Sequence, residues 1–264
     1  AEGMTGDELK EFIDQKLFPG LKNLNISSGN KRALIIHEIF EGTNNYMKNG
    51  TIIRQVLNQL NQIDFNVSED RHLFGDIYET ILKDLQSAGN YGEFYTPRAI
   101  TEFMTEIINP RLGEKVLDPA CGTGGFLTSA IENIRRQDVK GIDDLKTLET
   151  TIHGMEFKPL PFMLSVTNLI LHDIEVPNID YTDSLNREYT SIGKKDQVDV
   201  ILANPPFGAS VTDGVESNYP LSFRTTESAD LFLLLMIRYL KDGGRAAIVL
   251  PDGLLQNASM GYVR

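Results

Sequence analysis

The chain has 264 residues, 41% of them hydrophobic, with a formal net charge of −12 and a single cysteine, Cys121. This length and apolar content suffice for one large domain, or for a domain with a smaller companion. One cysteine excludes an intramolecular disulfide and a cysteine-rich metal site. No apolar run approaches the length of a membrane span, so we expect a cytoplasmic protein without membrane contact.

The acidic charge bears on the kind of partner. Proteins that grip nucleic acid place Lys and Arg on the phosphates, and these contacts supply most of the non-specific affinity. Here the basic residues are scattered in pairs such as Lys31-Arg32 and Lys194-Lys195, which is typical of solvated surfaces. Either the substrate is not DNA, or another subunit holds the DNA.

The first 90 residues predict helices and no strand. Thr5 and Glu8 form a capping box ahead of an apolar pattern, so a helix is expected to begin there. Gly89 to Gly92 breaks the helical pattern, and we place a boundary there between a helical domain (1–90) and a second domain (91–264). Three further helices are marked by apolar stripes, expected to be core: Ile35, Ile36, Ile39 and Phe40; Ile52, Ile53, Val56, Leu57 and Leu60; Leu73, Ile77, Ile81 and Leu85.

From about residue 97, helices and strands alternate. Thr96-Pro97 predicts a helix start, with the Thr96 hydroxyl at the N-cap and Pro97 at the first helical position. Strands separated by helices predict an α/β fold with a doubly wound, mostly parallel sheet. Strands are expected at 115–118, 151–156, 179–182, 198–203 and 244–250, helices at 125–136, 159–172 and 228–240, and a charged insertion at 137–149.

A glycine-rich turn, Asp118–Phe126, lies between a predicted strand and a predicted helix, where open α/β sheets bind ligands. Its glycines, Gly122, Gly124 and Gly125, permit close backbone approach, and the N–H groups that open the helix suit a carboxylate or a phosphate. Asp118 would repel a pyrophosphate but pair with an ammonium group. S-adenosylmethionine carries an ammonium and a carboxylate, so the turn favours this cofactor over a dinucleotide.

A second acid, Glu156, ends the next predicted strand, where it can accept hydrogen bonds from ribose hydroxyls. It follows Asp118 by 38 residues (156 − 118), more than the usual spacing of about 20. The insertion at 137–149 accounts for the difference. The alternative is a solvated acid at a strand end.

The strand at 198–203 leads directly into Asn204, Pro205, Pro206 and Phe207, here called the tetrad. An exocyclic amine on an aromatic base is a poor nucleophile because its lone pair is delocalised into the ring. Two acceptors that grip its N–H bonds would push the nitrogen toward a tetrahedral shape. The Asn204 amide oxygen and the Pro205 carbonyl can serve as these acceptors, and Phe207 offers a flat face for stacking. Alternatively, the prolines merely end a strand and Phe207 is core.

The two motifs would meet if the strand bearing Asp118 is central and the strand bearing Asn204 lies beside it, because both tips would then flank one crevice. Direct transfer in this crevice needs no covalent intermediate, so Cys121 should be dispensable. The four histidines lack the paired spacing of metal ligands, and we expect no metal.

Three segments in this order, Gly92–Arg98, Asp118–Phe126 and the tetrad, make nearly the whole chain resemble the modification subunit of type I restriction-modification systems. This resemblance implies a site-specific methyltransferase that moves a methyl group from S-adenosylmethionine to N6 of an adenine flipped out of duplex DNA. The tetrad residues Asn204, Pro205, Pro206 and Phe207 would be catalytic. Cofactor contacts are implied for Glu93, Phe94, Tyr95, Thr96, Pro97, Arg98, Thr123, Gly124, Gly125, Glu156 and Asp183, in addition to Asp118 and Gly122.

The resemblance also implies partners: a specificity subunit, a restriction subunit and a second modification subunit. A specificity subunit that reads the DNA would account for the acidic charge. The family's domain continues beyond the region matching Pro251–Gly253, so we expect a sheet that is incomplete in residues 91–264. Two alternatives stay open: a methyltransferase acting on protein glutamine or RNA, and a non-catalytic assembly subunit that binds the cofactor.

Overall fold

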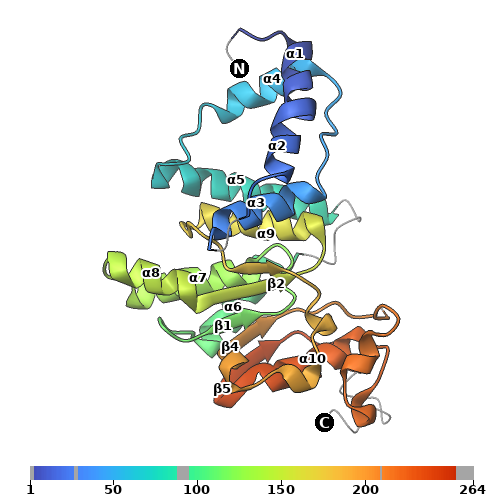
Figure 1. Ribbon diagram of the computed structural model, residues 1–264. Helices are drawn as coiled ribbons and strands as arrows, with labels where there is room; N and C mark the ends of the chain where they lie inside the picture. Colours follow the sequence, from blue (N-terminus) through green and yellow to red (C-terminus); the bar gives the residue numbers. More distant parts are fainter. Residues whose placement is uncertain (1–2, 27–28, 88–94, 209, 254–264) are drawn as a thin grey trace. The chain divides into compact units, whose positions relative to one another are not determined.

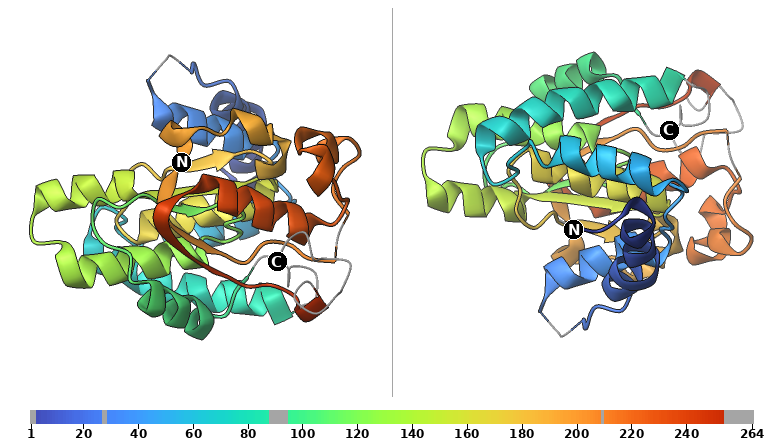
Figure 2. Two further views of the ribbon diagram at one scale, coloured as in Figure 1. Left: turned by 90° about the horizontal axis from the view of Figure 1, so that it is seen from below. Right: turned by 90° about the horizontal axis from the view of Figure 1, so that it is seen from above.

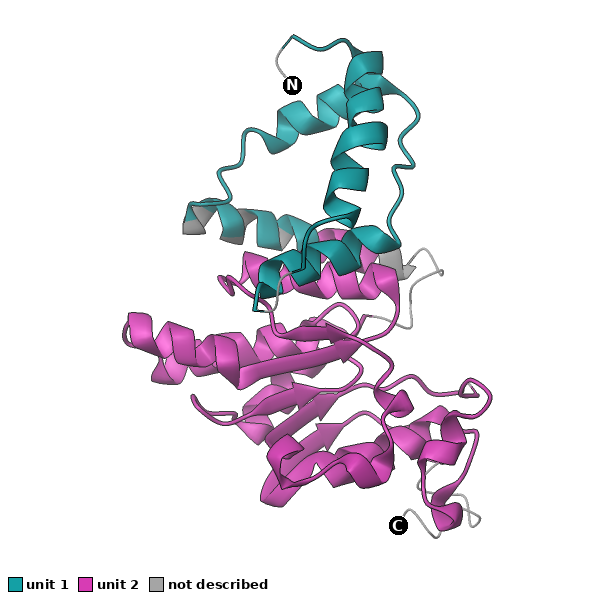
Figure 3. Ribbon diagram, in the orientation of Figure 1, with its two compact units in different colours: residues 1–78 teal, residues 79–264 magenta. Residues whose placement is uncertain are grey.

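The computed structural model describes residues 3–26, 29–87, 95–208 and 210–253. The chain divides into two compact units, residues 1–78 and residues 79–264 (Figure 3). The boundary expected at Gly89–Gly92 lies outside the described residues, and the two domains 1–90 and 91–264 stay a prediction. Among the described residues, no helix combines the length and the apolar character needed to cross a bilayer.

The first unit is built from helices. α1 (Gly6–Phe12) passes through a π-helical turn (Ile13–Leu17) into α2 (Phe18–Lys22), and α3 (Lys31–Glu41) and α4 (Gly50–Leu60) follow. α5 (Ser68–Ser87) begins in this unit and ends in the second. The predicted capping box is confirmed, since Thr5 Oγ1 accepts from the Glu8 N–H and the Glu8 carboxylate accepts from the Thr5 N–H. α1 and α4 touch at glycines: a Cβ on Gly50 would lie 1.9 Å from the Gly6 carbonyl oxygen.

The apolar stripes of this unit are less buried than predicted. Ile35 and Ile53 are buried, but Ile52 is 49% exposed, and Val56 and Leu60 are exposed as well. Helical spacing located α3 and α4 correctly. It did not show which apolar side chains of a helix find a packing partner, because that depends on neighbouring helices rather than on the local sequence.

The second unit contains the predicted doubly wound sheet. Within the described residues its strands are β1 (Val116–Asp118), β2 (Ile152–Glu156), β3 (Ile179–Tyr181), β4 (Val198–Ala203) and β5 (Leu240–Ile248). Their order is β3-β2-β1-β4-β5, and every neighbouring pair is parallel. β1 is therefore central, and β5, red in Figure 2, forms one edge. The α/β fold and the neighbouring positions of the Asp118 and Asn204 strands are as predicted.

Helices cover both faces of this sheet (Figure 1). α7 (Gly125–Asp138) and α9 (Pro159–Leu171) pack on one face, together with α6 (Arg98–Ile108). α10 (Ser228–Tyr239) covers the other face, where its Leu231 and Leu235 join Leu117 of β1 and Ile201 of β4 in the core. The segment 137–149, expected to be an insertion, contributes most of its residues to a helix, α8 (Ile142–Thr151), and β5 begins four residues earlier than the predicted Gly244.

The start of α6 also differs from the prediction. Pro97, not Thr96, occupies the N-cap position, and no side chain caps the helix. The Thr96 hydroxyl instead accepts a hydrogen bond of 3.1 Å from Nδ2 of Asn204. A contact between residues 108 positions apart thus replaces the local capping bond that the sequence suggested.

The buried face of α6 is polar. Thr101 and Thr105 are buried, and Ser129 of α7 donates a hydrogen bond of 2.8 Å to Thr101 Oγ1. The apolar Phe103 and Ile107, which marked this helix in the sequence, are 62% and 70% exposed. Small polar residues let α6 approach α7 closely, so the apolar pattern located the helix but not its buried side.

Candidate active site

Three predicted site residues follow the carboxyl ends of adjacent strands. Asp118 ends β1, Glu156 ends β2, and Asn204 comes directly after β4. β1 pairs with β2 on one side and with β4 on the other. Because the carboxyl ends of parallel strands lie at the same edge of a sheet, the fold brings the two acids and the tetrad to one crevice.

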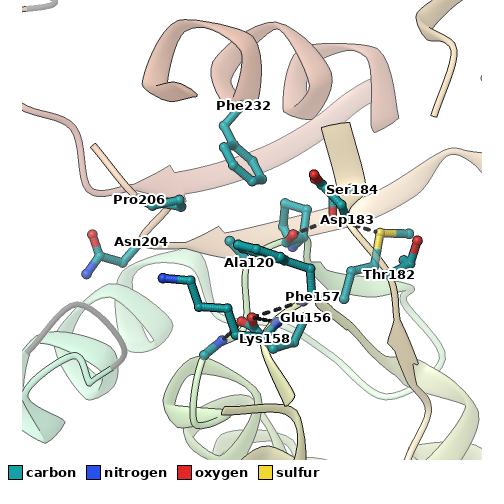
Figure 4. A pocket seen from close by; sticks show the side chains of 13 residues that line it. Ala120, Glu156, Phe157, Lys158, Thr182, Asp183, Ser184, Asn204, Pro206 and Phe232 are labelled. Atoms are coloured by element: carbon teal, nitrogen blue, oxygen red, sulfur yellow. Dashed lines mark hydrogen bonds between the residues drawn. The ribbon is translucent and has the colours of Figure 1, made fainter. Parts of the chain in front are cut away.

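Two pockets open in this crevice. The turn pocket, with about 290 Å³ of space, is lined by Thr96, Asp118, Ala120, Cys121, Gly122, Thr123, Gly125, Phe126 and Asn204. The strand-end pocket, with about 450 Å³ partly open to solvent, is lined by Pro119, Ala120, Gly122, Met155, Glu156, Phe157, Lys158, Thr182, Asp183, Ser184, Asn204, Pro206 and Phe232 (Figure 4). Ala120, Gly122 and Asn204 line both pockets. Asn204 therefore lies where the two spaces meet.

The glycine-rich turn is held by its backbone. The Gly122 N–H donates to Oε2 of Glu156 at 2.9 Å, and the Cys121 N–H donates to the Met155 carbonyl at 3.0 Å. Gly124 has a φ of +82° as the N-cap of α7, a conformation that favours glycine. Asn168 of α9 donates from Nδ2 to the Thr123 carbonyl at 3.0 Å. β2, α7 and α9 together fix the path of the turn.

Cys121 packs inside this turn. Its side chain is buried, and burial raises the pKa of the Cys121 thiol well above its usual value. A Cβ on Gly154 of β2 would lie 3.0 Å from the Cys121 sulfur and 2.8 Å from Leu127 Cδ1. The close contact explains a glycine in β2, and the buried neutral thiol is a packing group rather than a nucleophile.

The two acids are buried next to one another. Asp118 is 1% exposed, and its Oδ1 accepts from the Ala120 N–H at 3.1 Å. Burial raises the pKa of Asp118 to about 8; the Ala120 hydrogen bond opposes this shift and repulsion from Glu156 adds to it. No Lys, Arg or His in the described part of the chain forms an ion pair with Asp118. A buried carboxyl without a cation favours a ligand that brings an ammonium group.

Glu156 is also buried, but it accepts more hydrogen bonds from backbone N–H groups than Asp118 does. Burial raises its pKa, while N–H groups of Lys158, Gly122 and Phe157 oppose the shift, with bonds of 2.8 to 2.9 Å. A carboxylate can accept about four hydrogen bonds, so after these three bonds one acceptor site is left. Glu156 lines the strand-end pocket, where ribose hydroxyls are expected.

Asp183 and several residues that the sequence did not single out complete the strand-end pocket. Asp183 is half-buried, and its Oδ1 accepts from the Leu185 N–H at 2.9 Å. Figure 4 shows Phe232 of α10 above the pocket and Phe157 and Glu156 below it. Phe157 could have been found as the residue after the strand-end acid, whereas Phe232 lies inside an apolar helix and has no local signal.

The tetrad is fixed by two hydroxyls. Thr96 accepts from Asn204 Nδ2 at 3.1 Å, and Ser228 of α10 donates to the Pro206 carbonyl at 2.7 Å. Oδ1 of Asn204 is buried and has no hydrogen-bond partner. An unpaired buried acceptor is costly, and here it belongs to a residue that lines both pockets. Phe207 is 44% exposed, so its ring is open to a stacking partner.

Other predicted residues lie outside both pockets. Glu93 and Phe94 are not among the described residues. Tyr95 and Pro97 are described but line neither pocket. Arg98 lines neither, and its guanidinium contacts Glu102 at 2.8 Å, Glu79 at 3.8 Å and also Glu132. Three carboxylates engage Arg98, which ties the start of α6 to α7. Gly124, Pro205 and Phe207 adjoin lining residues without lining a pocket themselves.

Comparison with known proteins adds the family. A model of the N-6 DNA methylases matches residues 69–262. The chain belongs to the N-6 DNA methylase family. It is 55% identical over 257 residues to the type I restriction enzyme EcoEI methylase subunit of Escherichia coli, covering 97% of this chain and 52% of that relative. The predicted resemblance to type I modification subunits is therefore confirmed.

Solved structures agree with this assignment of the methylase. A modification subunit of a putative type I restriction enzyme from Vibrio vulnificus YJ016 superposes with a TM-score of 0.81 at 43% identity, over 94% of this chain and 53% of that one. A putative class I S-adenosylmethionine-dependent methyltransferase from Listeria monocytogenes, at 19% identity with a TM-score of 0.59, shares the fold over 96% of this chain and 78% of that one. S-adenosylmethionine is the cofactor of this methylase. The chain spans about half the length of the curated relatives it matches.

Proposed function

We propose that this methylase is the cofactor-binding and catalytic part of a type I modification subunit, and that it methylates N6 of adenine in DNA. The observation that carries the proposal is the buried, unpaired Oδ1 of Asn204, a residue that lines both pockets. An acceptor in this position suits the N–H of an amine that meets the methyl donor. No described contact inside the chain uses it.

The two pockets fit S-adenosylmethionine, which supplies an electrophilic methyl group on a sulfonium. Asp118 pairs with its ammonium, and the N–H groups of Thr123 and Gly125 bind its carboxylate, whereas the Gly124 N–H donates to the Cys121 carbonyl at 2.7 Å. In the strand-end pocket, Glu156 binds the ribose, and Asp183 binds the adenine beside Phe157. Gly122 and Gly124 let the backbone approach closely, and Pro97 and Arg98 act by fixing the start of α6. Glu93, Phe94 and Tyr95, which precede Thr96, complete the proposed cofactor contacts.

The tetrad prepares the nucleophile. Asn204 Oδ1 and the Pro205 carbonyl accept the two amine hydrogens, since the Pro206 carbonyl is already engaged by Ser228. Phe207 stacks on an adenine flipped out of the duplex. The amine lone pair forms the new N–C bond as the C–S bond breaks, and one amine proton leaves to solvent. Alignment of nitrogen, carbon and sulfur provides most of the acceleration.

The net charge of −12 shapes the proposed assembly. A specificity subunit holds and reads the DNA, because an acidic chain provides few phosphate contacts. A restriction subunit and a second modification subunit complete the complex, which acts in the cytoplasm. The name of the Escherichia coli relative, a type I restriction enzyme methylase subunit, supports this arrangement.

The proposal is tested with the full chain and its copurifying subunits, unmodified DNA and methyl-labelled S-adenosylmethionine. After digestion, we expect the label in N6-methyladenine. Label in a protein glutamine or in RNA would instead support a different acceptor. Cofactor binding without label in any acceptor, even with the specificity subunit present, would support a non-catalytic assembly subunit.

A further inference from the structure

Thr96 has a role that its sequence position does not suggest. As the residue before Pro97 it was expected to cap α6, yet its hydroxyl is 3.1 Å from Asn204 Nδ2 and Pro97 occupies the cap position. It is the one predicted residue of the segment 93–98 that lines a pocket within the described part of the chain. Its hydroxyl therefore lies at the tetrad rather than at the helix it precedes.

An asparagine at a transfer site needs its amide held in one orientation. Rotation of the amide by 180° exchanges oxygen and nitrogen, and a nitrogen facing the target amine would present a donor to a donor. Such a rotamer would repel the amine. In the structure, Nδ2 is occupied by Thr96 and Oδ1 is left unpaired.

We infer that Thr96 is the positioning residue of this methylase: its hydroxyl binds the Asn204 amide at Nδ2 and holds this side chain at the crevice, with Oδ1 left for the amine of the target base. The inference rests on the proposed function. Thr96 does not touch the reacting atoms in this role but acts through Asn204. It thus adds to the cofactor contact that the sequence implied.

The backbone around Thr96 is rigid enough for this task. A residue before proline is restricted to extended conformations, which limits where the Thr96 hydroxyl can point. The helix that follows is anchored to α7, because Arg98 contacts Glu132 and Ser129 donates to Thr101. Thr96 is therefore a fixed support for the side chain of Asn204, which directly follows β4.

The first test compares Thr96→Val and Thr96→Ser in the full chain with its partner subunits. Valine keeps the shape but cannot accept the Nδ2 hydrogen bond, so we expect kcat to fall about 10- to 100-fold, as for loss of one well-placed hydrogen bond. The dissociation constant of S-adenosylhomocysteine should stay within about twofold. Serine retains the hydroxyl and should restore most of kcat.

Thr105→Val is the matched control. It is the same substitution on α6, at a buried residue whose hydroxyl has no hydrogen-bond partner. It should leave kcat and cofactor affinity unchanged. If Thr105→Val lowered kcat as much as Thr96→Val, general damage to α6 would explain both effects and the inference would fail.

A double-mutant cycle with Asn204→Asp is the sharper test. In this background the Nδ2 hydrogen bond to Thr96 is already absent, so the effects of the two substitutions on kcat should be non-additive. Independent effects on kcat, or a Thr96→Val effect confined to cofactor affinity, would overturn the positioning role. If the unsubstituted complex does not methylate DNA adenine, the proposed function itself fails. If the unsubstituted complex methylates DNA adenine and the Thr96→Val complex has the same kcat, only the positioning role fails.

Discussion

The two halves of the crevice are held in different ways. The glycine-rich turn depends on backbone hydrogen bonds and tight contacts, such as Gly122 with Glu156 and Gly124 with its positive φ. The tetrad depends on two side-chain hydroxyls, from Thr96 and Ser228, that arrive from distant parts of the chain. Substitutions in the turn should therefore disturb cofactor binding, whereas those in the tetrad should affect the chemical step.

The largest effect is expected at Asn204. Asn204→Ala removes the acceptor for the amine, and methyl transfer should fall by at least about a thousandfold, the scale of a lost transition-state contact together with lost orientation. Cofactor affinity and assembly with the other subunits should be retained. Transfer of the labelled methyl group measures the chemical step, and calorimetric titration with S-adenosylhomocysteine measures cofactor affinity. Surviving transfer would show that the tetrad is not the acceptor site.

Gly124→Ala tests the other half of the crevice, the glycine-rich turn. A Cβ there would be strained at a φ of +82° and would lie 3.2 Å from Leu169 Cδ1. We expect cofactor affinity to fall about tenfold, which corresponds to roughly 1.4 kcal/mol. Gly113→Ala is the control, since Gly113 has a φ of +86° but no neighbour within 4 Å. Both variants should lose thermal stability, but unchanged affinity in Gly124→Ala would mean that the turn does not bind the cofactor.

Cofactor affinity should also depend on pH through Asp118. With a pKa raised to about 8 by burial, the free protein holds a proton on Asp118 at neutral pH. An ammonium ligand favours the carboxylate, so binding releases this proton and affinity rises with pH by up to about tenfold per unit. The rise levels off near pH 8, the pKa of Asp118, because above it the free protein no longer holds this proton.

Titration with S-adenosylhomocysteine from pH 6 to 8 in two buffers of different ionisation enthalpy measures this proton release. 5′-Methylthioadenosine lacks the ammonium and should bind without it. Equal pH dependence for both ligands would remove Asp118 from the ammonium site. For the free protein the sign is opposite: the folded state holds the Asp118 proton more tightly than the unfolded chain, so this group lowers the free energy of unfolding as pH rises from about 4 to 8.

The smallest effect is expected at Cys121. Its thiol is buried, with a pKa raised by burial, and it packs against Gly154. Cys121→Ala should leave methyl transfer within about twofold and lower stability by about 1 kcal/mol through a small cavity. Loss of transfer with cofactor binding intact would point to a covalent role and contradict direct transfer.

The sequence predicted the second unit better than the packing around it. Each strand from β1 to β4 was predicted to within two residues, because buried strands between helices have a strong pattern. The early start of β5 was missed, since Asp242-Gly243-Gly244 suggests a turn and Gly243 indeed has a positive φ. The exposed Phe103 and Ile107 show the same limit: periodicity identifies a helix but does not identify its partners.

The residues of the candidate site also fall into those that the sequence could predict and those that it could not. Asp118, Glu156 and Asn204 could be predicted because each stands at a strand end within a short motif. Phe232 could not, because it enters the strand-end pocket from the middle of α10. The pairing of Thr96 with Asn204 was hidden by a local rule for helix starts, which a contact across 108 positions overrode.

The central strand gives the site a further property. β1 has three residues, and its last one, Asp118, pairs with Gly154. A strand slip by a single residue would turn the Asp118 side chain to the opposite face of the sheet, and it would bring His153 or Met155 against the turn in place of the glycine. The position of the acid is thus tied to correct strand pairing. Cofactor binding accordingly reports on the register of the sheet as well as on the carboxylate.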